Sequence, residues 1–216
     1  MGLDLVVESS AKAGHESEWR TMMERSFAGQ EPSQAEIARF QDISVPGYQR
    51  IGAPRVGFDA AADAWIIAAR KATTPEQIAA TLKEFHGYYV LRLLTCDGVP
   101  KYSNGGLYGG ADETSFRGAF LSDCEEVLGK ALLEDAWNSK LPDAAVTYGR
   151  ALLAAADAAE VGSAVPKPRP SLMSRLLPAK RTNTPPPLAD QLDIVRAAGR
   201  WFIFWGERGH AIRAWF

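Results

Sequence analysis

The chain has 216 residues, of which 46% are hydrophobic and 23% are charged. These proportions are typical of a globular protein and exclude a wholly disordered chain. Residues 1–161 carry 15 Lys and Arg against 23 Asp and Glu, and an acidic body argues against nucleic-acid binding. The first residues lack a signal-peptide pattern, and no apolar run is long enough to span a membrane. We therefore expect a soluble, cytoplasmic protein without a membrane partner.

The first part of the chain predicts one strand and two helices. Residues 3–8 are rich in Leu and Val and predict a short strand. Residues 16–27 place apolar side chains at helical spacing and predict a helix. Ser33 with Glu36 three positions later forms a capping box, which starts a second helix that ends before Pro46.

The next part begins with an irregular segment. Residues 45–58 contain two prolines and three glycines, which predict a loop. Helical spacing returns at 59–71, and Thr74 followed by proline is a typical start of a further helix, which Gly87 ends. Residues 88–95 are mostly apolar and predict a buried strand.

A second irregular segment, residues 97–118, contains six glycines and is long for a loop within a compact domain. One long amphipathic helix is expected over 120–132, and an Ala-rich helix from Pro142 to about 160. Residues 162–187 hold seven of the thirteen prolines and five basic residues but no acidic one. We interpret them as a linker or excursion, which either is disordered, lies against the acidic body, or docks on a partner.

The C-terminal part predicts a helix over 188–198 and then two strands, 200–205 and 210–216, joined by a turn. Both faces of the aromatic run Trp201–Trp205 are apolar. Such a strand belongs in the middle of a covered sheet or at an interface between copies of the chain. Homo-oligomerisation through this hairpin is therefore one of the partner hypotheses.

Together these elements predict an α+β fold. The expected sheet is small and mainly antiparallel, and consists of the N-terminal strand, the strand near 88–95 and the C-terminal hairpin. Six or seven helices pack around it. Residues 1–161 and 188–216 are expected to form a single domain.

The sequence contains no complete catalytic, metal-binding or nucleotide-binding motif. Its histidines, His15, His86 and His210, are far apart and lack the spacing of a zinc site, so we predict neither metal nor cofactor. The glycine pairs are typical of turns rather than phosphate loops. Cys124 lies on an apolar helical stripe and is interpreted as a small buried side chain rather than a reactive thiol.

The candidate site combines the two irregular segments. Arginine, tyrosine and asparagine on loops are suited to hold planar or anionic groups. We expect segments 45–58 and 97–118 to face each other around a small polar or anionic ligand, with these binding residues: Tyr48, Arg50, Arg55, His86, Tyr102, Asn104 and Arg117.

The function is not fixed by these residues. The preferred hypothesis is a module that binds a small ligand or a protein through segments 45–58 and 97–118. The alternative is an enzyme acting on a small polar or anionic metabolite, which would need an acid or base within hydrogen-bond distance of a hydroxyl in the same cleft.

Overall fold

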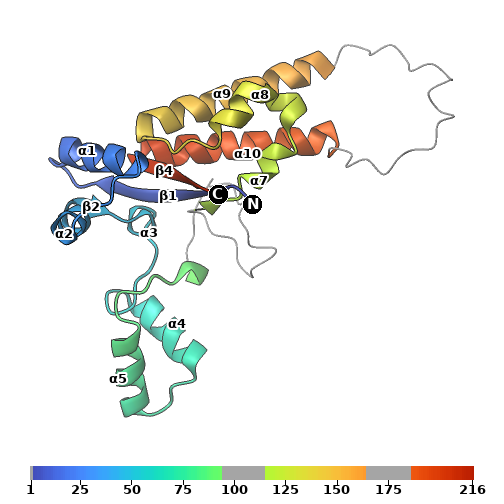
Figure 1. The fold of residues 1–216 in the computed structure, drawn as a ribbon. Helices are drawn as coiled ribbons and strands as arrows, with labels where there is room; N and C mark the ends of the chain where they lie inside the picture. Colours follow the sequence, from blue (N-terminus) through green and yellow to red (C-terminus); the bar gives the residue numbers. More distant parts are fainter. Residues whose placement is uncertain (1, 94–114, 164–185) are drawn as a thin grey trace.

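The computed structural model describes residues 2–93, 115–163 and 186–216. They form a small antiparallel sheet with helices packed on both of its faces (Figure 1). The α+β fold class is confirmed. Residues 164–185 of the expected linker lie outside the described part, and the single-domain organisation stays a prediction.

The sheet is built around strand β1, Asp4–Ala11, which pairs along one edge with β4, His210–Trp215. Two short strands share the other edge of β1. Strand β2, Ser44–Val45, pairs with its last two residues, and β3, Ser115–Phe116, pairs with its second and third. The two ends of the chain therefore lie in one sheet, as the sequence predicts (Figure 1).

The two faces of the sheet cover different cores, because successive side chains of a strand point in opposite directions. Ile212 of β4 packs into the main core with Trp201 and Phe202, whereas the preceding Ala211 packs on the other side with Trp19. Arg213 therefore shares the face of Ala211, and this alternation directs it toward the candidate site described below.

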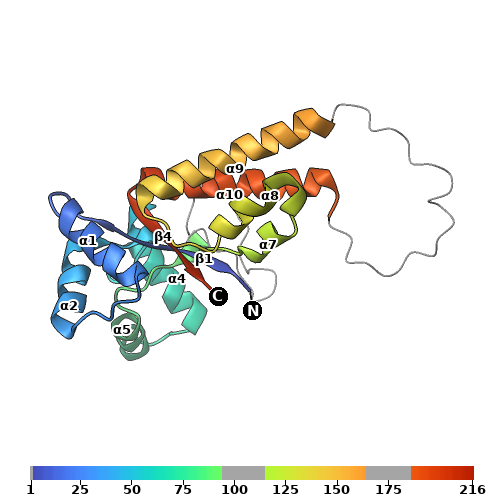
Figure 2. The same cartoon turned by 45° about the horizontal axis from the view of Figure 1, so that its top comes forward.

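The main core is formed by two long helices, α9 (Pro142–Ser163) and α10 (Leu188–Glu207), which lie side by side in both views (Figures 1 and 2). Helix α9 confirms the predicted Ala-rich helix. Helix α10 lies between α9, α8 (Glu125–Asp135) and the sheet, and more than half of its residues are buried. Its aromatic residues thus form the centre of the molecule.

The predicted C-terminal hairpin is wrong in its first strand. Residues 200–205 continue helix α10, and only 210–215 form a strand, which pairs with β1. An apolar run on two faces is equally typical of a helix covered on nearly all sides. Trp201, Phe202 and Trp205 are fully buried in this way.

The opposite face of the sheet is covered by α1 (Glu16–Phe27) and α2 (Gln34–Ile43). Both helices confirm the sequence prediction. The capping box is present, because the Ser33 hydroxyl accepts from the backbone N–H of Glu36 and the Glu36 carboxylate accepts from that of Ser33. Such a cap fixes the start of α2.

Helices α4 (Ala60–Arg70) and α5 (Pro75–Glu84) stand apart from the layer of long helices (Figures 1 and 2). They have their own small core around Val56 and Val90. The predicted strand near 88–95 is wrong over its described part, residues 88–93. Residues 88–90 instead pair briefly with 54–56, and residues 91–93 form a 3-10 turn, η1 (Leu91–Leu93).

The predicted single helix over 120–132 is divided. Helix α7, Ala119–Ser122, ends before Cys124, and α8, Glu125–Asp135, follows it with a kink at Gly129. Gly129 has a φ of 65°, which glycine adopts at little cost. The break lets both helices pack on α10.

The described residues contain nine α-helices, of which α3 (Gly47–Arg50) and α7 are single turns. Seven helices of ten or more residues remain, in agreement with the expected six or seven. Within the described ranges, no helix combines the length and the apolar character that a bilayer crossing needs.

Candidate functional site

The structure brings three of the seven predicted site residues into one cluster. Tyr48 on α3 lies against Tyr89, with their ring centroids 5.7 Å apart. The guanidinium of Arg55 lies 5.3 Å from the ring centroid of Tyr89 and 4.6 Å from that of Phe58. His86 completes the cluster with a ring centroid 5.2 Å from that of Phe58.

Two other predicted residues lie at different places along β1. Arg50 donates from Nη2 to the Ser10 hydroxyl, 2.9 Å away, near the end of the strand. Arg117 follows β3, whose Phe116 pairs with Leu5 near the start of the strand. Tyr102 and Asn104 lie outside the described residues, so the meeting of segments 45–58 and 97–118 stays a prediction.

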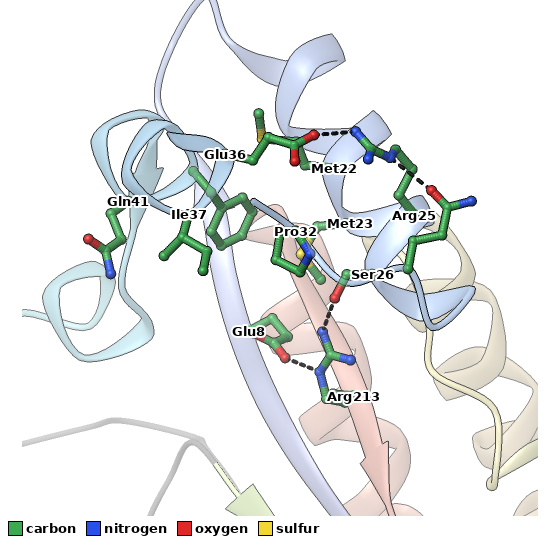
Figure 3. Close-up of a pocket in the computed structure, with 12 residues that line it drawn as sticks. Glu8, Met22, Met23, Arg25, Ser26, Pro32, Glu36, Ile37, Gln41 and Arg213 are labelled. Atoms are coloured by element: carbon green, nitrogen blue, oxygen red, sulfur yellow. Dashed lines mark hydrogen bonds and ion pairs between the residues drawn. The ribbon is translucent and has the colours of Figure 1, made fainter. Parts of the chain in front are cut away.

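A cavity of about 290 Å³ lies between α1, α2 and the sheet. The sequence patterns did not predict it. Figure 3 shows apolar side chains from both helices around it. Because they come from two helices and a connecting loop, their convergence has no local sequence signal. The apolar lining consists of Met22, Met23, Pro32, Ile37 and Phe40.

The inner wall of this pocket, which we call the α1–α2 pocket, carries a polar group on the sheet (Figure 3). Arg213 of β4 donates from Nε to the Glu8 carboxylate of β1 and from Nη2 to the Ser26 hydroxyl at 2.9 Å. Its guanidinium also lies 5.0 Å from the ring centroid of Phe27. The group is held in place from several sides, and Glu8 compensates its charge.

A second ion pair lies at the rim of the pocket. The Arg25 guanidinium donates from Nη1 to the Glu36 carboxylate at 2.6 Å and from Nε to the Gln30 side chain at 2.9 Å. Hydrogen bonds from the backbone and side chain of Ser33, and then from Arg25, lower the pKa of Glu36 to about 2. Glu36 is therefore ionised at neutral pH and is paired with Arg25.

A neighbouring cavity of about 350 Å³ shares two lining residues, Phe40 and Gln41, with the α1–α2 pocket. It extends to Ser44 and to Tyr48 of the predicted segment 45–58. Segment 45–58 thus borders this second cavity but contributes no lining residue to the α1–α2 pocket.

Two other titratable groups, His210 and Cys124, are buried. His210 is fully buried, and its Nδ1 lies 2.7 Å from the Glu8 carbonyl oxygen, so Nδ1 carries the proton. Burial is the main cause that lowers the pKa of His210 to about 4. Cys124 is buried as predicted, and burial raises its pKa to about 12. Neither group opens on the pocket.

Among the described residues, no group of three or more His, Cys, Asp or Glu side chains is arranged to hold a metal ion. No protein-family model, no curated protein and no solved structure matches the chain.

Proposed function

We propose that the protein binds a small, mainly apolar, uncharged molecule in the α1–α2 pocket. The observation that carries this proposal is the composition of the pocket. A hollow of about 290 Å³ has an apolar wall, an ordered polar group on the sheet, the Glu8–Arg213–Ser26 set, and the Arg25–Glu36 ion pair at its rim. Ligand sites generally combine a concave apolar surface with a few fixed polar groups that orient the ligand.

The charges favour a neutral ligand over an anion. Arg213 is compensated by Glu8, and Arg25 is compensated by Glu36. A carboxylate entering the pocket would lose water without gaining an unbalanced positive charge. A hydroxyl or carbonyl group can instead bond to Ser26 or to a guanidinium N–H while the apolar part covers Met22 and Ile37.

The test is a titration of the full chain with n-hexanol and with hexanoate, followed by protein NMR. We expect n-hexanol to shift the methyl signals of Met22, Met23 and Ile37 in a saturable manner. Hexanoate should bind about tenfold more weakly or worse, since the charge must be desolvated. Equal binding of both probes, or shifts spread evenly over the surface, would contradict the proposal.

A pocket-filling variant provides the matched control. Ile37→Trp places an indole in the α1–α2 pocket and is expected to abolish the n-hexanol shifts of Met22 and Met23. Ile67→Trp makes the same change at a half-buried position of α4, outside the lining residues, and should leave them unchanged. If Ile37→Trp binds n-hexanol as the unaltered chain does, the pocket is not the site.

A further inference from the structure

The cluster around Arg55 lies outside the α1–α2 pocket and contains none of its lining residues. The guanidinium of Arg55 lies 4.6 Å from the ring centroid of Phe58 and 5.3 Å from that of Tyr89. Its Nε donates to the Gly87 carbonyl oxygen at 2.9 Å. Two rings and one hydrogen bond therefore fix the position of this side chain.

The surroundings of Arg55 reinforce its orientation. Tyr89 is supported by Tyr48, and Phe58 is supported by His86. Gly87 has a φ of 87°, and a Cβ there would lie 3.2 Å from Nη2 of Arg55. A side chain at position 87 would thus disturb both the backbone and the guanidinium, so the glycine keeps this arrangement open.

The charge of Arg55 has no carboxylate partner among the described residues. The two acids nearest in sequence are otherwise engaged, since Asp59 accepts from the Ala61 N–H at 2.8 Å and Asp63 accepts from the Gly57 N–H at 2.7 Å. Arg70, at the end of helix α4, differs from Arg55 in having a carboxylate partner. It also lies over a ring, that of Phe85, but it is paired with Glu84 at 3.8 Å.

We propose that Arg55 binds the carboxylate of a planar aromatic acid. Because Nε is used by Gly87, the two Nη groups remain to take the two carboxylate oxygens side by side. Phe58 is 66% exposed and its ring centroid lies 4.6 Å from the Arg55 guanidinium, so part of this ring is open to the ring of the ligand. Fixing the guanidinium in advance reduces the entropic cost of binding.

The experiment is a benzoate titration of the ¹⁵N-labelled full chain at constant ionic strength, with the Nε–Hε signal of Arg55 and the ring signals of Phe58 as readouts. We expect saturable shifts of both. Arg55→Lys keeps the charge but loses the two-pronged geometry, so it should raise the Kd by about fivefold or more. Arg70→Gln is the matched control and should leave the Kd unchanged.

Three further probes separate the two parts of the proposal. Acetate and inorganic phosphate test the charge alone, and benzyl alcohol tests the ring alone. All three should bind at least about fivefold more weakly than benzoate. Phe58→Leu should abolish the preference for benzoate over acetate while Arg55 still responds to both.

Equal binding of benzoate by the unaltered chain and Arg55→Lys, or shifts that depend only on ionic strength, would overturn the proposal. These outcomes do not involve n-hexanol, so they are independent of the proposed function.

Discussion

Gly149 of α9 and Gly199 of α10 bring the backbones of the two long helices into direct contact. A Cβ at Gly149 would lie 2.7 Å from the carbonyl oxygen of Gly199, and a Cβ at Gly199 would lie 2.9 Å from that of Gly149. The obstacle is backbone on both sides and cannot rotate away. The separation of α9 and α10 therefore depends on these two residues having no side chain.

Gly149→Ala is accordingly expected to lower the free energy of unfolding by roughly 1–3 kcal/mol, because the helices must separate or bend to admit a methyl group. Chemical denaturation measures this change. Gly162→Ala in the same helix is the control, since a Cβ there meets nothing within 4 Å. That variant should be unchanged or more stable by up to about 1 kcal/mol. Equal effects of the two variants would contradict the assigned role of Gly149.

Lys140 caps the C-terminal end of helix α8. Its side chain is only 4% exposed, its Nζ donates to the carbonyl oxygens of Asp135 at 2.5 Å and Asn138 at 3.0 Å, and it lies 4.3 Å from the ring centroid of Tyr148. Burial lowers the pKa of Lys140, but these acceptors and the Asp135 carboxylate support its charged form.

Lys140→Met keeps the apolar stem but removes the donors, so we expect a loss of about 2 kcal/mol from the free energy of unfolding. Lys130→Met, within helix α8, is the matched control. Lys130 is 82% exposed and pairs with Glu134 at 3.5 Å, so its replacement should cost less than about 0.5 kcal/mol. A melting comparison of the two variants decides the question.

Because His210 is buried in its neutral form, we expect the free energy of unfolding to fall in mild acid. Burial lowers its pKa to about 4 in the folded protein, from an unfolded value of 6.5. Between these values the unfolded chain binds the additional proton, so this contribution is complete above pH 6.5 and is lost as the pH falls toward 4. The loss from pH 7 to pH 5 is about 2 kcal/mol.

The measurement is the free energy of unfolding at pH 7 and pH 5 for the unaltered chain and for His210→Asn. Asparagine does not titrate and its amide can donate to the Glu8 carbonyl oxygen in place of Nδ1. The variant should therefore show a smaller decrease between the two pH values. An identical decrease in both proteins would assign the effect to other groups.

The ion pair between Glu8 and Arg213 should contribute more than the exposed pair between Arg20 and Asp143. The Glu8 and Arg213 side chains are 25% and 20% exposed, against 67% for Asp143 and 46% for Arg20. We expect Glu8→Gln to cost about 2 kcal/mol, because Arg213 keeps a partly buried charge. Asp143→Asn should cost less than about 1 kcal/mol. Similar values for both variants would show that burial does not strengthen the inner pair.

Local signals in the sequence predicted local structure well. The capping box at Ser33 and the Thr74 cap gave helix starts that the structure confirms. These signals succeed because the cap residue and its N–H partner are three positions apart, so tertiary packing is not needed to read them.

The errors arose where burial alone decides the conformation. The Trp201–Trp205 run is apolar on two faces, and this pattern does not distinguish a central strand from a central helix. The α1–α2 pocket was missed for a related reason. Glu8 and Arg213 are 205 residues apart in sequence, and only the pairing of β1 with β4 brings them together. By contrast, Tyr48, Arg55 and His86, three of the seven residues predicted to form one binding site, do lie in one cluster, and their binding role stays a prediction.

The pairing of β1 with β4 has a consequence for synthesis in the cell. Glu8 is synthesised long before His210, but its carbonyl oxygen is hydrogen-bonded to the His210 imidazole in the folded protein. Until then one backbone edge of β1 has no strand beside it and can join foreign strands. A prematurely terminated product that stops before His210 keeps this edge open permanently.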